Sequence, residues 1–442
     1  MDLTRESPIP LAAQRPADVA AEAKPGLRQW WWLILAGLTY AMNNLDRNIL
    51  NVVQEQVKNE FGLSDSQLGA LSGLAFGAVY ALSAIGMGLL ADRVNRRNML
   101  ASVLVIWSVM TAVCAFVQSF GALLLARMSV AAAEAGTSPT STSMISDWFP
   151  PQRRATAMSI YYLGPPLGLI ISTLLGGLIA QHYGWRMAFL VAGAPGLVLA
   201  ALLLLTCPHP KRGSADVAHK DDTPAPGLLD AVAHIWRNAP LRWSVAAVTL
   251  ATMASASFSS FVVSFLMRTH HLPISQAGGA VSLCVGVASA VGILAGGPLA
   301  DRLARGPRSN LRVAAATVSL SAIGIAICVL SGATLPALAG LTLFGCFHMS
   351  YIAPCFSTVL NGSPPRLRGI SIAILMLVAN MVGGASGPIV VGFISDQIGG
   401  PDSLRFALLT VAPEFLATAG LLLLAAQSLP ARLRPVGEPI LT

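Results

Sequence analysis

Charged residues are scarce in this chain of 442 residues. Lys, Arg, Asp and Glu together make up 11% of it, whereas hydrophobic residues make up 54%. Soluble globular proteins carry roughly 25% charged residues, because their surfaces face water. So few charges exclude one large soluble domain, since most of its surface would be apolar. The composition therefore predicts an integral membrane protein.

Cysteine is equally sparse, and its six residues stand singly in apolar stretches. No two of them have the spacing of a metal site, and no loop holds a pair that would form a disulfide. A Ser/His/Asp pattern, a metal motif and a nucleotide motif are all missing, and the Gly-rich stretches lack the Lys of a phosphate-binding loop. We therefore expect no enzyme activity, no metal and no cofactor.

The net charge of +8 does not indicate nucleic-acid binding. The basic residues stand in short loops between apolar segments rather than on one face or in one tail. At the N-terminus, residues 1–26 are polar and rich in Pro and Ala, and the first apolar run ends in no small-residue cleavage site. We expect no secretory signal, so this first run is a retained membrane span.

Twelve apolar segments follow one another along the chain. A helix needs about 20 residues to cross a hydrocarbon core of ~30 Å. Segments of that length are expected at residues 30–53, 67–91, 99–118, 121–147, 155–181, 186–207, 241–267, 275–300, 310–331, 334–360, 368–396 and 404–428. The prediction is an all-α membrane protein with twelve transmembrane helices.

Two internal repeats indicate a duplicated architecture. Most of residues 88–97 returns at 297–305, and residues 150–155 return in similar form at 364–369, at nearly the same offset. The twelve helices should therefore form two pseudo-symmetric halves. The expected organisation is a disordered cytoplasmic N-tail at 1–29, an N-terminal six-helix half at 30–207, a cytoplasmic linker at 208–240, a C-terminal six-helix half at 241–428 and a cytoplasmic C-tail at 429–442.

The distribution of basic residues predicts the orientation. If both termini are cytoplasmic, the outside loops hold only Lys58, Arg186, Arg268 and Arg405. Cytoplasmic loops carry an excess of Lys and Arg in membrane proteins. We therefore expect a multi-pass protein of the cell membrane with both termini in the cytoplasm, and the compact loops favour a bacterial inner membrane.

The stretch at 88–97 carries a family resemblance. Its residues Gly88, Leu90, Ala91, Asp92, Arg93, Arg96 and Arg97 match the loop signature between spans two and three of the major facilitator superfamily. A weaker copy stands between spans eight and nine, as that family has it. Asn95 stands where the family usually has Gly. The resemblance covers the chain from Trp30 to about Gln427 and implies the major facilitator fold and a transport function.

A narrower resemblance is to the Spinster-like branch of that superfamily. Its motifs are Asn43, Asp46 and Arg47 in the first span, Arg127, Ala131, Ala133, Glu134, Ala135, Ser138 and Pro139 in the fourth, Asp147 to Pro150 after it, and Gly184, Trp185, Arg186 and Phe189 further on. Members of the branch are associated with lysophospholipid and sphingosine-1-phosphate transport. Several of these motifs also occur in members that carry organic anions.

Four charged residues stand inside the predicted spans of the N-terminal half: Asp46, Arg47, Arg127 and Glu134. A charge in the hydrocarbon region costs ~2.5–3.5 kcal/mol, so those that remain are usually paired and functional. Arg127 and Glu134 are seven residues apart and share a helix face. We predict that Asp46 and Glu134 couple transport to protons, with Arg47 and Arg127 as their partners or as substrate contacts. The alternative is a permanent salt bridge without titration.

A second set of charges stands at the cytoplasmic ends of spans two and four. We predict a cytoplasmic gate that closes this side and breaks when it opens, made of Asp92, Arg93, Asp147, Arg153 and Arg154. The alternative is that these charges only set the topology. The resemblance to the superfamily also implies the gate.

The C-terminal half has few buried charges. Phe258, Phe261 and Phe265 lie on one face of the seventh span, and Met349 and Phe356 add apolar bulk in the tenth. We predict a hydrophobic site for an acyl chain, although such a stripe also suits plain helix packing. Isolated His348 is expected to be a packing residue, and Glu414 could face a cavity or the membrane surface.

Together these features predict a proton-coupled, alternating-access transporter for lysophospholipids or related amphiphiles. A charged N-terminal half would bind the headgroup and an apolar C-terminal half the acyl chain. The first alternative is a proton-linked carrier of organic anions, in which the two arginines bind a carboxylate. A non-transporting sensor with a transporter fold is the second. The expected partners are the amphiphile, protons and the bilayer, with no nucleic acid, and the protein is expected to be a monomer.

Overall fold

The computed structural model describes residues 26–91, 93–208, 227–293, 306–364 and 366–429. All the regular structure in these ranges is helical. Most of the expected tails at 1–29 and 429–442, the centre of the expected linker and the repeated motif at 297–305 lie outside the described residues. The prediction of an all-helical chain is confirmed for the part that the structure describes.

Nine stretches of the described chain are long and apolar enough to cross a membrane. They are residues 65–91, 96–116, 156–206, 239–269, 274–293, 307–330, 334–362, 368–398 and 403–428. This confirms a multi-pass membrane protein. The predicted number of twelve spans is not reached by this criterion of length and composition, and it stays a prediction.

The helices before the linker are called the N-terminal group. Their bounds are α2 (Leu27–Phe61), α3 (Asp65–Gly69), η1 (Ala70–Leu74), α4 (Ala75–Ala91), α5 (Arg96–Val113), η2 (Cys114–Phe116), α6 (Phe120–Glu134), α7 (Thr137–Trp148), α8 (Pro151–Tyr161) and α9 (Gly164–Thr206). The segment η1 is a π-helical turn within an otherwise continuous helix, and η2 is a short 3₁₀ turn.

The helices after the linker are called the C-terminal group. Their bounds are α10 (Leu228–Arg237), α11 (Ala239–Thr269), α12 (Ile274–Val281), η3 (Ser282–Val287), α14 (Pro307–Leu330), α15 (Thr334–Phe347), α16 (Ile352–Gly362), α17 (Arg368–Val378), η4 (Ala379–Gly384), α18 (Ala385–Ile398), α19 (Ser403–Leu409) and α20 (Val411–Ser428). Two of these segments, η3 and η4, are again π-helical.

Local sequence signals explain where several helices begin and end. Ser64 caps α3, because its hydroxyl accepts a hydrogen bond from the backbone N–H of Gln67. Ser119 caps α6 through the backbone N–H of Ala122 in the same way. Gly62 ends α2 in the left-handed conformation, with φ of 64°, which glycine adopts without strain. Gly184 interrupts α9 with φ of 81° and ψ of 166°.

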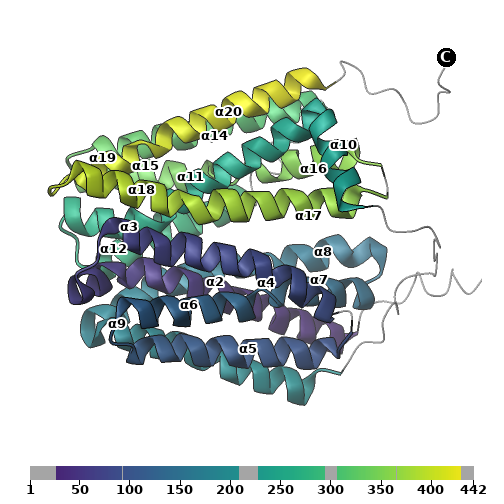
Figure 1. The fold of residues 1–442 in the computed structure, drawn as a ribbon, viewed down its shortest axis with the longest axis horizontal. Helices are drawn as coiled ribbons and strands as arrows, with labels where there is room; N and C mark the ends of the chain where they lie inside the picture. The colour runs from purple at the N-terminus through teal and green to yellow at the C-terminus, as the bar shows by residue number, and fades with distance from the viewer. Residues whose placement is uncertain (1–25, 92, 209–226, 294–305, 365, 430–442) are drawn as a thin grey trace, which may run out of the picture.

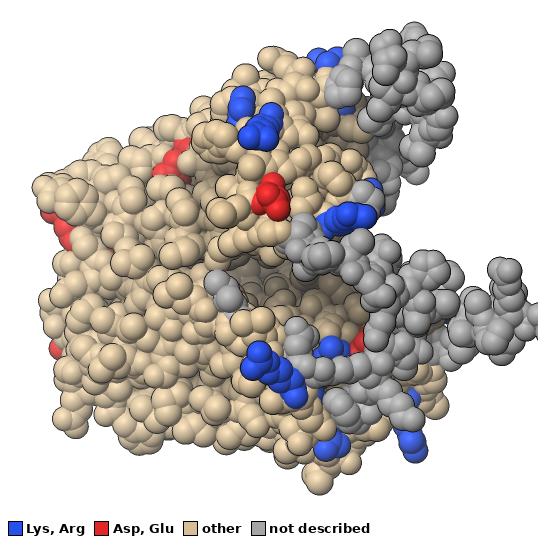
Figure 2. Space-filling view, turned by 45° about the vertical axis from the view of Figure 1, so that its right-hand side comes forward, with Lys and Arg blue, Asp and Glu red and all other residues tan. Residues whose placement is uncertain are grey.

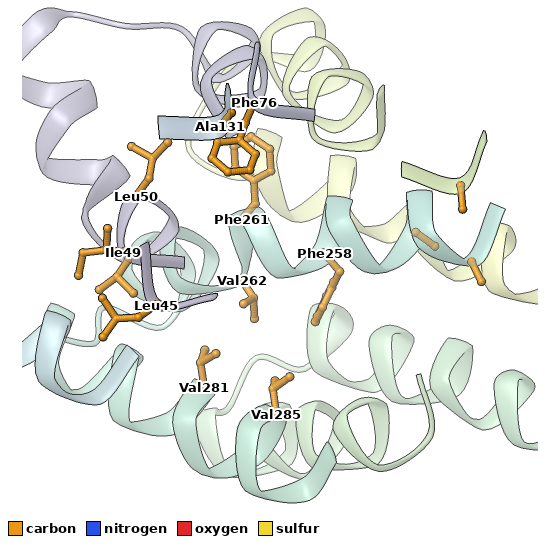
Figure 3. Packing of buried hydrophobic residues seen from close by; sticks show 14 of the residues in the cluster. Leu45, Ile49, Leu50, Phe76, Ala131, Phe258, Phe261, Val262, Val281 and Val285 are labelled. Carbon is orange, nitrogen blue, oxygen red and sulfur yellow. The ribbon is translucent and has the colours of Figure 1, made fainter. Parts of the chain in front are cut away.

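The two groups lie side by side (Figure 1). Helices of the N-terminal group fill the lower part of that view, and most of the C-terminal group fills the upper part. Between them, α3 and η1 pack against α18, α9 packs against α12 and η3, and α2 packs against α11. Buried apolar side chains of both groups meet there, with Leu45 and Ile49 of α2 near Val281 (Figure 3).

The groups touch mainly toward one end of the molecule, which we call the closed end. It is the end at which α2 finishes at Phe61 and α11 finishes at Thr269. Gln54 donates hydrogen bonds to the Ser260 carbonyl oxygen (2.6 Å) and the Ser264 hydroxyl (3.0 Å) across the contact. The opposite end, where α2 begins, is called the open end. Figure 2 shows the surface hollowed between the two groups on this side.

Candidate transport site

Asp46 lies within α2 and is buried inside the N-terminal group. Its carboxylate oxygen Oδ2 accepts a hydrogen bond from the Thr111 hydroxyl of α5 at 3.1 Å. Its backbone carbonyl accepts one from Nη1 of Arg127 in α6 at 3.0 Å. The guanidinium of Arg127 is therefore held next to the Asp46 backbone by α6. The contact with Thr111 was not anticipated from the sequence.

Arg47 and Glu134 form an ion pair between α2 and α6. Nε of Arg47 lies 3.1 Å from Oε2 of Glu134. The Glu134 side chain is 0% exposed, whereas 31% of the Arg47 side chain is exposed. Arg47 therefore stands between the buried carboxylate and accessible space, and an anionic ligand would meet the arginine first.

Two aromatic residues of α4, Phe76 and Tyr80, contact the arginines through their rings. The guanidinium carbon of Arg47 lies 4.3 Å from the Tyr80 ring centre and 5.1 Å from that of Phe76. The guanidinium carbon of Arg127 lies 5.0 Å from the same Phe76 ring. Cation–π contacts of this kind are attractive and gain strength away from water. The Phe76 ring thus makes a cation–π contact with both arginines.

The four charged residues expected to act together are in fact neighbours, brought together by α2 and α6. We call Asp46, Arg47, Arg127 and Glu134 the charge cluster. The simplest expected arrangement placed all four around a cavity. In this conformation Asp46, Arg127 and Glu134 are buried, and only Arg47 is partly exposed. Phe76, Tyr80 and Thr111 complete the site. An aromatic pair four residues apart in the second span is the one signal that could have indicated two of them.

The expected gate residues lie at the open end of the N-terminal group. Asp147 forms a buried ion pair with Arg96, a residue that the predicted gate did not include. Arg154 donates hydrogen bonds to the backbone carbonyls of Phe149 (2.9 Å) and Ser146 (2.7 Å). Arg93 and Arg153 are exposed, and Asp92 lies outside the described residues. The Asp147 pair joins α7 to α5 within one group, so it persists while this end is open.

The expected hydrophobic site divides into two parts. Phe258, Phe261 and Phe265 are fully buried, and the Phe258 ring centre lies 4.7 Å from that of Phe344. Figure 3 shows Phe261 projecting from α11 toward Phe76, and Phe258 projecting to the other side of the same helix. Met349 is exposed, whereas Phe356 packs partly against the core. In this conformation the three phenylalanines therefore act as packing residues and border no accessible surface.

Two further polar residues were singled out in the sequence of the C-terminal group. His348 is buried, stacks on the Phe344 ring at 4.6 Å and places Nδ1 3.1 Å from the Gly345 carbonyl oxygen. Glu414 is partly buried in α20. Within the described ranges, no three His, Cys, Asp or Glu side chains gather as metal ligands would.

The comparison with protein families gives a match over most of the chain. The model of the Major Facilitator Superfamily matches residues 36–388. This range contains the charge cluster, the closed-end contacts of α2 and α11, and the helices on both sides of the linker.

Relatives with different described roles resemble the chain. An MFS-type efflux pump of Mycolicibacterium smegmatis is 33% identical, over 88% of this chain and 89% of that protein. A D-galactonate transporter of Escherichia coli is 26% identical, over 85% and 91%. The sphingosine-1-phosphate transporter SPNS2 of Danio rerio is 26% identical, over 83% and 76%.

A solved structure resembles the fold as a whole. It is that of a bacterial homologue of the human lysosomal transporter Spinster, in an inward-facing and unoccupied conformation. The TM-score is 0.80 at 25% identity, over 92% of this chain and 98% of that chain. The resemblance to the Spinster-like branch is therefore confirmed. Because the family model matches most of the chain, and the relatives are transporters rather than enzymes, the chain belongs to the Major Facilitator Superfamily of membrane transporters.

Proposed function

We propose that this protein is a proton-coupled, alternating-access transporter of lysophospholipids or related amphiphilic lipids. The observation that carries the proposal is the ion pair of Arg47 with Glu134. The Glu134 carboxylate is buried, whereas the Arg47 side chain is partly accessible. Among the described residues of the C-terminal group, by contrast, no Asp, Glu, Lys or Arg is buried. Such an arrangement suits a ligand with an anionic headgroup and an apolar chain better than it suits a sugar, which needs polar side chains from both groups.

Twelve spans in two halves belong to this proposal. The helix α9 has 43 residues and would be far longer than a bilayer is thick, at ~1.5 Å per residue. Its break at Gly184 divides it into two spans of ordinary length. The pair α6 and α7, each too short by itself, makes a further span, and α2 is long enough despite its charged end. The halves are then residues 30–207 and 241–428.

The orientation is proposed from the basic loops. Both termini would lie in the cytoplasm of a bacterial inner membrane, so the open end would face the cytoplasm and the conformation would be inward-facing. The similarity to an inward-facing Spinster homologue supports this assignment. The protein would act as a monomer, since the proposed path lies between its own two halves.

Proton coupling would work through competition for Arg47. An anionic headgroup that reaches the exposed side of Arg47 weakens the ion pair with Glu134. The buried carboxylate then lies without a full counter-charge in a low-dielectric site, where the charged form is costly. It takes up a proton, and it releases that proton when the substrate leaves and the pair forms again. Asp46 would act as the second carboxylate, with Arg127 beside it.

One rival function has support of its own. The relative that transports D-galactonate carries a small carboxylate, and Arg47 with Arg127 could bind such a group through their planar guanidinium groups. The substrate would then be an organic anion and the apolar side would have no part in recognition. The headgroup chemistry is shared, so the test must offer both substrates.

The test measures uptake of a labelled lysophospholipid and of labelled galactonate into proteoliposomes, with and without an imposed pH gradient. Wild type is compared with Glu134→Gln, and Glu414→Gln serves as a matched control because it removes a membrane carboxylate outside the charge cluster. We expect lipid flux that follows the gradient, that loses this dependence in Glu134→Gln and that keeps it in Glu414→Gln.

The outcomes separate the functions. Lipid flux that ignores the gradient and survives Glu134→Gln contradicts proton coupling and leaves a facilitator. Galactonate flux without lipid flux establishes the organic-anion carrier in place of the lipid transporter. Binding of either compound without any flux would favour a sensor with a transporter fold.

A further inference from the structure

The short helix α10 (Leu228–Arg237) has three distinct faces. Ala231 and Ile235 are buried against the protein. Asp230, His234 and Arg237 share the polar face, since successive residues of a helix are about 100° apart. The third face is apolar and exposed, and its residues, with their exposed fractions, are Leu228 (62%), Leu229 (81%), Val232 (44%) and Trp236 (72%). Large apolar side chains on the outside of a helix indicate a partner that covers them.

The position of α10 limits what that partner can be. Only Asn238 separates α10 from α11, whose residues 239–269 form a candidate membrane span. The helix α10 therefore lies at the level where α11 leaves the membrane. It is also fixed to the bundle, because it packs against α11 and α17, and Arg242 donates a hydrogen bond to the Trp236 carbonyl at 3.1 Å. The exposed apolar face thus stands beside the bilayer surface.

We infer that α10 is a membrane-surface helix whose exposed apolar face inserts between the lipid headgroups at the open end. An amphipathic helix with Trp and Leu on one face and charged residues on another binds in the interface plane, with its apolar side at the headgroup–acyl boundary. Trp is itself enriched at this level, because its ring is amphipathic. This inference requires only that α11 spans the membrane. It does not depend on the substrate or on proton coupling, and it goes beyond the proposed transport function.

The charges around α10 favour an anionic lipid surface. Arg237 at the end of α10 is exposed, and Arg366 and Arg368, which lie just before and at the start of the neighbouring helix α17, are exposed as well. Asp230 is the one acidic residue of α10. Basic residues near a membrane are attracted by anionic lipids within a Debye length. The lipid bound there should therefore carry a negative headgroup charge.

Membrane attachment of α10 would also act on the bundle. His234 places Nε2 3.2 Å from the carbonyl oxygen of Gly362, the last residue of α16. The same helix packs on α17, which continues through η4 into the closed-end contact of α18. A bound lipid surface would hold this corner of the C-terminal group while the N-terminal group moves.

The test uses tryptophan fluorescence of the full protein in liposomes. The contribution of Trp236 is the difference between wild type and Trp236→Phe, a variant that keeps an apolar ring and should fold. We expect bromine atoms placed high on the acyl chains to quench roughly half or more of this difference signal, because the ring lies at the headgroup–acyl boundary. Aqueous iodide should quench it little.

Two results would overturn the inference. Quenching of the Trp236 signal by iodide but not by brominated lipid would place the ring in water. Quenching by neither would mean that protein, such as another segment of this chain, covers the face. The anionic preference has its own check: exchanging neutral for anionic brominated lipid should raise the quenching in wild type, and raise it less in Arg237→Gln, which keeps only Arg366 and Arg368. Because no transport is measured, failure here and failure of the proposed function remain distinguishable.

Discussion

Phe76 contacts both arginines of the charge cluster through its ring. It faces the guanidinium groups of both Arg47 and Arg127, at 5.1 and 5.0 Å from its centre. Two like charges near one ring would repel each other unless the ring and the nearby acids offset the repulsion. The aromatic face offers negative charge density without adding a titratable group. In the proposed coupling mechanism, the ring would keep both arginines in place when Glu134 loses its ion pair with Arg47.

We predict that Phe76→Leu destabilises the protein even though it keeps most of the volume. Losing two cation–π contacts should lower the free energy of unfolding by roughly 1–3 kcal/mol. Thermal unfolding in detergent can be followed with a thiol-reactive dye, because Cys114 and Cys355 are buried until the fold opens. Tyr80→Phe is the control, since it keeps its ring beside Arg47. Equal unfolding temperatures for wild type and Phe76→Leu would rule out this role of the ring.

Thr111 offers a second prediction at the same scale. Its hydroxyl donates to Oδ2 of Asp46, whose other carboxylate oxygen is buried and has no hydrogen-bond partner among the described residues. Thr111→Val removes the donor at nearly constant shape and should cost about 1–3 kcal/mol of stability, because a buried acceptor is left unsatisfied. Thr111→Ser keeps the donor and should behave as wild type. The dye assay compares the two, and equal losses would point to packing instead.

At the scale of elements, close helix contacts at the closed end depend on glycine. A Cβ atom added at Gly73 in η1 would lie 2.6 Å from the carbonyl oxygen of Ala385, and one at Gly77 in α4 would lie 2.8 Å from the Ala385 Cβ. Small residues let membrane helices approach in this way. The π-helical turns η1 and η4 lie on the two sides of this contact, where a π-bulge lets a helix change its direction.

We predict that Gly73→Val separates α3 and α4 from α18. The added side chain has no space while the closed end is closed, so the population should move toward a conformation that is open there. Spin labels at exposed positions Gln67 of α3 and Gln397 of α18 would report a longer distance. Gly86→Val is the matched control, because Gly86 lies in the same helix and a Cβ there meets nothing within 4 Å. Distances that match between the two variants would refute the steric argument.

Comparing the predicted spans with the helices of the structure shows which features hydropathy can predict. Hydropathy located the nine stretches of the described chain that are long and apolar enough to cross a membrane, because such a stretch must be apolar over its whole length. It placed the end of the first span at residue 53, whereas α2 runs to Phe61. The extra turns carry Glu55, Lys58 and Glu60, whose charges are paired with Arg268, Asp65 and Arg186. Those partners come from other helices, so hydropathy along one segment could not reveal them.

For the candidate site, the sequence predicts the charged residues but not how they pair. The cost of a charge in the membrane identified the four members of the charge cluster. Their pairing depends on the relative register of α2 and α6, which is set by helix packing and not by either sequence alone. Phe76 and Thr111 look like ordinary apolar-span residues until that register is known. The sequence predicts a linker at 208–240, whereas the structure has the helix α10 within it. The three faces of α10 could have been recognised from the spacing of its ten residues.

At the scale of the whole molecule, one arginine joins the two groups of helices at the closed end. Arg268 of α11 donates to both carboxylate oxygens of Glu55 at 3.0 Å and to both of Asp65 at 2.9 Å. Glu55 and Asp65 belong to the N-terminal group. Ser395 of α18 donates to Asp65 at 2.7 Å, so that a second element of the C-terminal group holds the same carboxylate.

This arrangement must break whenever the closed end opens, so it should set the balance between the two conformations. Arg268→Gln removes the cation that Glu55 and Asp65 share, so that Glu55 loses its ion pair and Asp65 keeps only the one with Lys58. We expect the closed-end conformation to lose roughly 1–3 kcal/mol relative to the open one, which is about 5- to 150-fold in population. Spin labels at the exposed residues Asn59 of α2 and Gln276 of α12 would then show a larger share of long distances.

Arg186→Gln is the control, because it separates the loss of a link between the groups from the loss of an ion pair within one group. Arg186 pairs with Glu60 at 2.6 Å at the same end of the molecule, but both residues belong to the N-terminal group. Its loss removes an ion pair without removing a link between the groups, so the distance distribution should stay as in wild type. A shift of equal size in both variants would mean that local destabilisation, and not the link across the groups, opens this end. A shift in Arg268→Gln alone would show that this arginine holds the two groups together at the closed end.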